Sequence, residues 1–275
     1  MPRRSLSPTE ASVVLSLEEE GREEVTLDEI QHRAGVSRGF ARKLAHGLRA
    51  KGWLQRVGRG RYLLNPSDQG PDPIVDTDPF RFGSRLVRPY YFGFATAAEL
   101  HRLLPQLGRT YYVVTPRRGV AEWGGVARFR RVTVRPQRFF GLQTVVRRGE
   151  KLSVSDPERT VVDCLDRPEL CGGLAGVVQI LDSASERVDW WRLERYVRRF
   201  GSRSLARRLG FLVAARTDRL RPPSGWLDRL RPRAREPFTP LGAPSEFGRR
   251  GARDPRWHVI RNVPDRQLLA EVDVR

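Results

Sequence analysis

Residues 26–64 read TLDEIQHRAGVSRGFARKLAHGLRAKGWLQRVGRGRYLL, and this stretch decides the fold prediction for the first part of the chain. Thr26 and Glu29 have the spacing of a capping box, in which the hydroxyl accepts from a free amide and the carboxylate bonds back to the cap residue. A helix is therefore expected to begin after Thr26 and to end at Gly35, which suits a left-handed helix terminus. The apolar side of this helix carries Leu27, Ile30 and Ala34.

The next predicted helix follows the cap residue Ser37 and extends to about Lys51. On a helical wheel, one narrow apolar arc carries Phe40, Ala41, Leu44 and Leu48. The opposite side carries Arg38, Arg42, Lys43, His46 and Arg49. Gly39 lies near the helix start, where a missing side chain permits close approach. A helix that packs by one face and is basic on the other can enter a DNA major groove.

Residues 53–57 and 61–64 are predicted strands joined by the turn Gly58-Arg59-Gly60. Arg56, Arg59 and Arg61 are expected to project from this hairpin toward a DNA backbone or minor groove. Upstream, Ser7 to Glu10 form a second capping box that opens a first helix. Three capped helices followed by a basic hairpin predict a winged helix-turn-helix over residues 1–65. The predicted contacts to double-stranded DNA are Ser37, Arg38, Gly39, Arg42, Lys43, His46, Arg49, Arg56, Arg59 and Arg61.

Two other uses of such a segment stay open at this point. A basic amphipathic helix is often only a solvated face, and a winged helix can dock a protein instead of DNA. The net charge of the whole chain favours a polyanionic partner, since 51 Lys and Arg face 32 Asp and Glu, for a net +19. Residues 1–66 hold 12 of the basic and 8 of the acidic residues, which leaves +15 for the remainder. The second part of the chain is therefore basic in its own right.

The chain lacks the signs of a membrane, secreted or metal protein. No apolar run approaches the ~18–20 residues of a membrane span, and the first residues lack the apolar stretch of a signal peptide. Cys164 and Cys171 are the only cysteines and are expected to be buried thiols, and the four histidines make no ligand pattern. We therefore expect a cytoplasmic protein with no membrane contact, no metal and no cofactor.

The residues after the hairpin predict a larger mixed α+β domain, so that the fold class of the whole chain is α+β. Residues 66–73 are turn-rich and form the predicted linker, followed by a domain over 74–275 that can divide into 74–150 and 151–275. The helices expected in this part are a short one after Asp78 and others over 96–104, 155–165, 175–181, 190–200 and 204–215. Strands are expected at 111–115, within 120–134, at 142–146 and at 257–260, with loops in the rest of 238–263.

No catalytic constellation emerges from the sequence. Gly58-Arg59-Gly60 lacks the Lys-Ser/Thr and the helix of a phosphate loop. Asp156 is expected to cap a helix, and Asp163 to pair with Arg159 four residues before it. Glu150-Lys151 and residues 271–273 (Glu-Val-Asp) are isolated fragments of a metal-nuclease pattern. The prediction is a binding protein and not an enzyme.

Several motifs after the linker follow one another in an order that is similar to a known family. They are Tyr90-Tyr91-Phe92, Ala97-Ala98-Glu99-Leu100-His101, the strand at 111–115, the run from Val154 to Asp163, Gly172-Gly173, the run from Arg207 to Leu212, and the late segment 257–262. With this series the chain resembles the AbiEi family of abortive-infection antitoxins. The helix at 97–103 departs from the usual family pattern.

The resemblance implies an antitoxin of a type IV toxin–antitoxin system that acts in phage defence. Such a protein binds double-stranded DNA at repeats in its own promoter and represses transcription. The resemblance also implies a nucleotidyltransferase toxin as functional partner, countered without a stable complex by the C-terminal domain. The alternative function is an ordinary winged-helix regulator whose second domain senses a ligand or forms a dimer, with the aromatic stretches 90–94 and 190–191 as a pocket lining or, more simply, as core.

Overall fold

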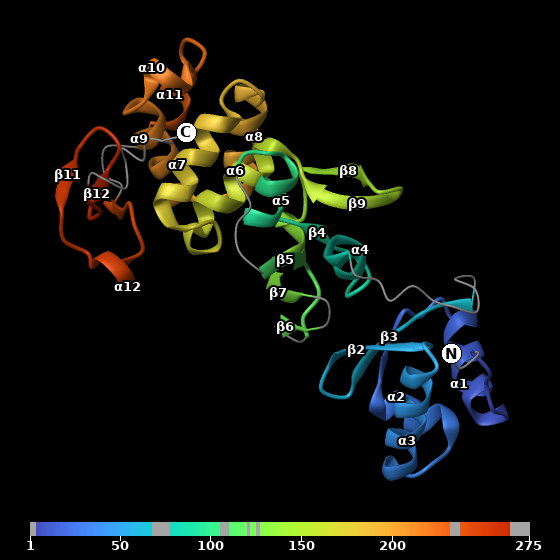
Figure 1. The fold of residues 1–275 in the computed structure, drawn as a ribbon. Coiled ribbons are helices and arrows are strands. Elements are labelled where there is room, and N and C mark those ends of the chain that lie inside the picture. Colours follow the sequence, from blue (N-terminus) through green and yellow to red (C-terminus); the bar gives the residue numbers. More distant parts are fainter. Residues whose placement is uncertain are drawn as a thin grey trace, which may run out of the picture. The chain divides into compact units, whose positions relative to one another are not determined.

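The computed structural model describes residues 4–67, 78–104, 110–119, 122–124, 127–231 and 237–264. The chain has the predicted mixed α+β character. It divides into two compact units. Figure 1 labels the helices and strands along the chain. Unit 1 comprises Met1–Tyr90, Arg109–Thr133 and Arg148–Leu152, and unit 2 comprises Tyr91–Gly108, Val134–Arg147 and Ser153–Arg275. The predicted linker at 66–73 lies outside the described residues from residue 68 onward.

The first part of unit 1 contains three helices and a small antiparallel sheet. The helices are α1 (Pro8–Glu19), α2 (Leu27–Ala34) and α3 (Arg38–Ala50). The strands are β1 (Glu24–Thr26), β2 (Leu54–Gly58) and β3 (Arg61–Leu64), in the order β1-β3-β2. Strand β1 was not predicted: three residues are too few to show alternation, and it forms because Glu24 to Thr26 pair with β3.

The predicted helix boundaries in this part are confirmed by their capping bonds. Both capping boxes form, at Ser7 with Glu10 and at Thr26 with Glu29. Gly35 ends α2 in the left-handed region at φ 64°. The Ser37 hydroxyl accepts from the amide of Phe40 at 3.3 Å and thereby starts α3. Glu10 also accepts from Lys51 Nζ at 2.6 Å, which ties the start of α1 to the end of α3.

The core of this part is formed by the inner faces of the three helices and the sheet. From α3 it takes Ala41, Leu44, Ala45 and Leu48, the i, i+3, i+4, i+7 stripe of an amphipathic helix. The interpretation of Phe40 as part of this apolar face is wrong, because its side chain is 48% exposed. Phe40 lies at the edge of the wheel arc, and the core closes without it.

The rest of unit 1 contains α4 (Pro79–Ser84) and the strands β5 (Thr110–Thr115), β6 (Glu122–Trp123) and β7 (Arg128–Thr133). The strand order is β6-β7-β5, with β5 and β7 parallel and β6 and β7 antiparallel. Phe82 of α4 stacks on Phe129 of β7, with ring centroids 5.2 Å apart. The prediction of one or two strands within 120–134 is confirmed for the described residues.

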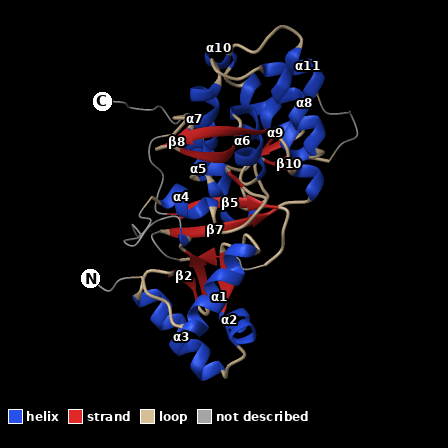
Figure 2. Cartoon of the chain, turned by 90° about the vertical axis from the view of Figure 1, so that its right-hand side faces the viewer, coloured by secondary structure: helices blue, strands red, loops and turns tan. Residues whose placement is uncertain are grey.

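Unit 2 is mainly helical (Figure 2). Its longer helices are α6 (Pro157–Asp166), α7 (Gly173–Ala184), α8 (Trp190–Phe200) and α9 (Arg203–Ala214). Its shorter helices are α5 (Phe94–Leu100), α10 (Thr217–Leu220), α11 (Trp226–Leu230), α12 (Pro244–Phe247) and the 3-10 turns Pro136–Arg138 and Pro168–Leu170. Helices α6, α8 and α9 pack against one another and form the centre of the unit.

The strands of unit 2 are short. They are β4 (Tyr91–Phe92), β8 (Leu142–Arg147), β10 (Thr239–Pro240), β11 (Ala252–Asp254) and β12 (Val259–Arg261), while β9 (Glu150–Ser155) crosses the boundary between the units in the sequence. Strand β4 is parallel to β9, and β10-β12-β11 form a separate sheet.

Several expectations need correction in this unit. Strands β4 and β9 were missed, the helix expected at 96–104 begins at Phe94 and ends at Leu100, and the last strand begins at Val259 and not at residue 257. The rest of 238–263 was expected to form loops but contains β10, α12 and β11, which are too short to show a periodic pattern. Within the described residues, no helix is both long enough and apolar enough to cross a membrane.

Candidate nucleic-acid interface

A basic groove lies between the start of α3 and the β2–β3 hairpin, with a cavity volume of about 640 Å³. We call it the α3–hairpin groove. Its lining residues are Thr26, Leu27, Asp28, Arg38, Arg42, Arg56, Arg59, Gly60, Arg61 and Tyr62. The structure thus brings together five of the arginines that the sequence singled out from two separate elements.

Local structure fixes the two walls of this groove. The Ser37 cap sets the start of α3, so that Arg38 and Arg42 follow one turn apart. The hairpin turns at Gly60, where φ is 67°, and the Gly60 carbonyl accepts from the Leu27 amide at 2.8 Å. This bond ties the hairpin tip to the start of α2. The register of β2 and β3 shifts between Arg56 and Gly58, and this irregularity lies beside the groove.

The five groove arginines differ in how far their charge is compensated. Arg38 pairs with Asp28 at 2.7 Å, but both side chains are well exposed, so water screens this pair. Arg56 Nε donates to the Gly58 carbonyl at 3.1 Å. Arg42 and Arg59 are exposed and form no ion pair with any described residue. These two guanidiniums therefore carry the least compensated charge in the groove.

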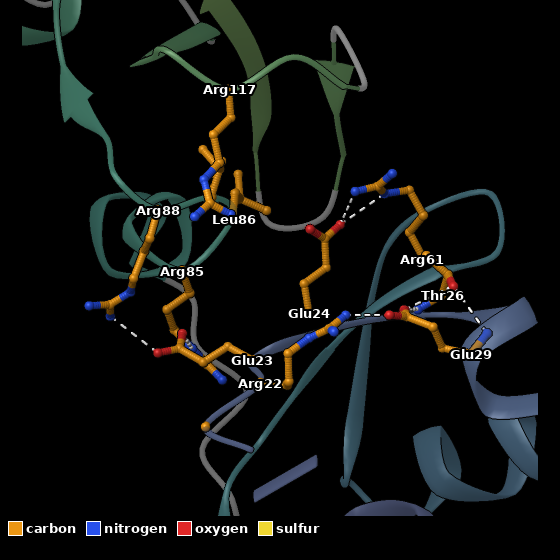
Figure 3. A pocket seen from close by; sticks show the side chains of 12 residues that line it. Arg22, Glu23, Glu24, Thr26, Glu29, Arg61, Arg85, Leu86, Arg88 and Arg117 are labelled. Atoms are coloured by element: carbon orange, nitrogen blue, oxygen red, sulfur yellow. Dashed lines mark hydrogen bonds and ion pairs between the residues drawn. The ribbon is translucent and has the colours of Figure 1, made fainter. Parts of the chain in front are cut away.

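Arg61 is held differently, because it forms an ion pair with Glu24 of β1 (Figure 3). Arg61 also lines a second cavity of about 700 Å³ that contains the Arg22–Glu29 pair and Glu23. Glu23 accepts from Arg85 and Arg88, each at 3.1 Å. An arginine that already has a carboxylate partner contributes less net charge to a polyanion than Arg42 or Arg59.

The other predicted contact residues occupy several different positions. Lys43, His46 and Arg49 are exposed on α3 but do not line the groove. The Ser37 hydroxyl is used as the helix cap. At Gly39, an added Cβ would meet only Ser37 Oγ, at 4.0 Å, so the space beside this glycine is open to a ligand.

Sequence reasoning missed the exposure of two aromatic residues. Tyr62 lines the groove, and Phe40 is exposed on the first turn of α3, away from the groove. The signal for Phe40 was available in the sequence, because the stripe through Ala41, Leu44, Ala45 and Leu48 is complete without it. An exposed aromatic ring on a helix that enters DNA can contact a thymine methyl group.

The structure shows no cluster of three or more His, Cys, Asp or Glu able to hold a metal ion among the residues it describes. The fragment at 271–273 lies outside them. Cys164 and Cys171 are free and buried, which confirms the prediction of buried thiols. Burial raises the pKa of the Cys164 thiol well above its ordinary value, which makes this thiol a poor nucleophile.

In unit 2, two motifs that lie far apart in the sequence meet in one buried hydrogen-bond network. Arg159 of α6 is fully buried and donates from Nε to Asp163 Oδ1 at 3.0 Å, as the four-residue spacing predicted. Arg159 Nη2 also donates to the Tyr91 hydroxyl at 3.0 Å, which in turn donates to Asp163 Oδ2 at 3.1 Å. Asp156 caps α6 as predicted, and it accepts from the Arg159 amide at 2.7 Å. We call Tyr91, Arg159 and Asp163 the buried triad.

A second meeting of distant motifs involves Gly210 of α9 and Trp257. The Trp257 ring is 1% exposed, and a Cβ added at Gly210 would lie 2.1 Å from it. Any larger residue at position 210 would therefore displace the ring. Both pairs of motifs therefore contribute to the packing of unit 2. The aromatic stretches 90–94 and 190–191 do so as well, through the buried residues Tyr91, Phe92, Phe94 and Trp190. Trp191 is the exception, because it is 39% exposed.

The fold and these two sets of residues define a mixed α+β protein with a basic groove in one unit and a tightly packed helical centre in the other. Residues 91–215 match the family model of the AbiEi antitoxin C-terminal domain. This segment, which contains the buried triad, therefore belongs to the AbiEi antitoxin C-terminal domain family, and the predicted resemblance is confirmed for it. The family supports an antitoxin role in a toxin–antitoxin or abortive-infection system and suggests a protein without enzymatic activity.

A solved structure shares the fold over almost the whole chain. The crystal structure of the RV2827C protein from Mycobacterium tuberculosis superimposes with a TM-score of 0.55 and 20% sequence identity, covering 97% of this chain and 95% of the other. No curated protein matches this chain in sequence.

Proposed function

We propose that this protein is an antitoxin that binds double-stranded DNA through a winged helix-turn-helix at residues 1–65 and represses its own promoter. The observation that supports DNA binding most is the α3–hairpin groove, in which exposed arginines from two elements converge on one concave surface. Helix α3 would enter the major groove, and the hairpin would lie along the backbone. Arg38 and Arg42, which project from α3 into the groove, would read base edges.

The hairpin arginines have a different role in this proposal. Arg56 and Arg59 lie on the strand and turn of the hairpin, and they would contact phosphates, which fixes the position of the protein but not its choice of sequence. Asp28 beside Arg38 adds selectivity, since its carboxylate repels any phosphate that approaches α3 in the wrong position.

The antitoxin activity is proposed for residues 74–275, with a nucleotidyltransferase toxin as functional partner and no stable complex between the two. The family of residues 91–215 supports the antitoxin activity, and the kind of toxin is part of the proposal. Division of labour between the two activities is expected, because the groove residues all lie before residue 65 and the matched segment begins at residue 91.

The test uses the full chain and its own promoter. Binding of wild type and of the Arg42→Ala/Arg59→Ala variant is measured on a promoter duplex and on a shuffled duplex of equal length. The matched control is Arg195→Ala, an exposed arginine of α8. DNA binding through the groove predicts loss of promoter binding in the double variant alone. Equal binding by all three proteins would remove the groove from the proposal.

The same variants test the antitoxin part when they are co-expressed with the toxin of the adjacent gene. Rescue of growth by the Arg42→Ala/Arg59→Ala variant would support an activity separate from DNA binding. Loss of rescue in a folded variant would make DNA binding part of the antitoxin mechanism.

A ligand-sensing regulator is the competing function, and the second cavity in unit 1 is the observation that favours it. This cavity of about 700 Å³ is lined by charged side chains and shares Arg61 with the α3–hairpin groove. The neighbouring gene discriminates between the two functions: a nucleotidyltransferase favours the antitoxin, and a transporter or a metabolic enzyme favours the regulator.

A further inference from the structure

Unit 2 contains a small cavity of about 300 Å³ where α8 ends, α9 begins and α11 ends. Five arginines line it, and we call it the arginine cavity: Arg198, Arg203, Arg207, Arg229 and Arg231. None of them belongs to the α3–hairpin groove or to the buried triad. The function of this cavity is therefore a separate question from DNA binding by residues 1–65.

Contacts with other residues of unit 2 fix three of these arginines: Arg198, Arg207 and Arg229. The Glu194 carboxylate is 2% exposed and forms ion pairs with Arg198 and with Arg229, the latter at 3.5 Å. Arg207 is 4% exposed and donates to Thr239 Oγ1 at 2.8 Å. Because these contacts restrict the side chains before any ligand arrives, little rotamer entropy is left to lose on binding.

The positive charge of the cavity exceeds the negative charge beside it. Five guanidiniums face two carboxylates, Glu194 and Asp228, of which Asp228 pairs with Arg231 at 3.2 Å. Arg203 is exposed and forms no ion pair within the part of the chain that the structure describes. It is also the first residue of α9, a 12-residue helix whose amino end adds partial positive charge. Like charges held this close repel one another, and a bound anion would relieve that repulsion.

We propose that the arginine cavity binds the polyphosphate group of a free nucleotide. Guanidinium groups match phosphate oxygens in pairs, and a cluster of them selects a multiply charged anion over a single carboxylate. The cavity has less than half the volume of the α3–hairpin groove, about 300 Å³ against about 640 Å³. This size suits a terminal di- or triphosphate better than the continuous backbone of a duplex.

The test measures binding of sodium pyrophosphate and of Mg²⁺-free ATP to the full chain by calorimetry. The Arg203→Glu variant removes an exposed guanidinium without breaking an ion pair, and Arg195→Ala on the neighbouring helix α8 is the matched control. We expect wild type and the control to bind both ligands with similar affinity. Arg203→Glu should bind them at least about tenfold more weakly, the usual loss for one charge-assisted contact.

Two outcomes would overturn the proposal. One is equal binding of pyrophosphate by all three proteins, or no binding at all. The other is binding of a 10-nucleotide single-stranded RNA with no binding of pyrophosphate or ATP, which would make the cavity a contact point for a nucleic-acid backbone. Promoter binding by Arg203→Glu, measured in parallel, separates this result from any failure of the proposed DNA-binding function.

Discussion

The arginines of the α3–hairpin groove and Arg159 of α6 are the same residue type in opposite environments. Arg42 and Arg59 are exposed and have no ion-pair partner in the described residues, whereas Arg159 is fully buried. Both neighbours of Arg159 in the buried triad, Tyr91 and Asp163, accept hydrogen bonds from its guanidinium group. The guanidinium carbon also lies 4.5 Å from the centre of the Phe140 ring. A buried arginine that is paired with a carboxylate is closed to a ligand, while one that faces solvent is available to it.

The same comparison explains why the high arginine content of the chain says little by itself. A positive patch forms where arginines have no carboxylate beside them, and the fold decides which arginines have such a partner. Asp163 is the decisive neighbour in the buried triad: burial raises the pKa of its carboxyl group, and the guanidinium of Arg159 opposes that rise.

The first prediction concerns the buried triad. Arg159→Ala leaves Asp163 buried without its cation and should lower the free energy of unfolding by about 3–5 kcal/mol. Chemical denaturation of the full chain measures this loss. Arg159→Met/Asp163→Leu should lose less than Arg159→Ala, because no charge is left unpaired. A loss below ~1 kcal/mol in Arg159→Ala would show that this buried arginine contributes no more to the free energy of unfolding than an exposed arginine of the groove does.

The second prediction concerns the helix side of the groove. Arg38→Ala/Arg42→Ala should lose at least ~1–3 kcal/mol of discrimination between promoter and shuffled DNA if either side chain reads a base. The free energy of unfolding should change little, because both side chains are exposed. Binding titrations on both duplexes, with denaturation of the same variant, separate the two effects. Unchanged specificity would exclude this end of α3 from base reading.

The third prediction separates two arginines of the hairpin. Arg59→Ala should reduce the log–log slope of DNA affinity against salt by about 0.9, the value for one lost phosphate contact. Arg61→Ala should reduce it less, since Glu24 already compensates the charge of Arg61. Titrations at several salt concentrations give both slopes. Equal reductions would mean that the Arg61–Glu24 pair opens on DNA.

The fourth and smallest effect is a pH dependence in unit 2. His101 Nε2 bonds to the Ser155 carbonyl at 2.6 Å, and burial lowers the pKa of His101 below its ordinary value. As the pH is lowered, the unfolded chain, whose histidine has a pKa of about 6.5, therefore takes up a proton at a higher pH than the folded chain does. The contribution of His101 to the free energy of unfolding should be fully present above a pH of about 6.5 and should decrease as the pH falls through the folded-state pKa.

His101→Gln tests that pH dependence, because glutamine keeps a donor for the Ser155 carbonyl but does not titrate. Its unfolding free energy should change less than that of wild type when the pH is lowered from about 6.5. Parallel curves for the two proteins would assign the pH dependence to other groups.

The sequence by itself determined the local structure of the first part of the chain. Capping pairs such as Ser7 with Glu10 and Thr26 with Glu29 act within one turn, so three residues suffice to predict a helix start. The same holds for Asp156 at α6 and for the Arg159–Asp163 pair, whose spacing is set by the helix. The family resemblance, too, was visible in the order of the motifs.

Only the tertiary structure decided which residues are exposed and which have partners. Phe40 was expected in the core and is exposed, while Arg61 was expected on the surface and pairs with Glu24. Strands β1 and β4 and the arginine cavity arise from segments distant in sequence, and no local pattern encodes such pairings. Strand β9 is different, because it follows β8 directly in a hairpin whose turn contains Gly149. Periodicity gives the direction of a side chain relative to its own helix or strand. Exposure and charge compensation depend on what packs against that element, and this is fixed only when the whole chain has folded.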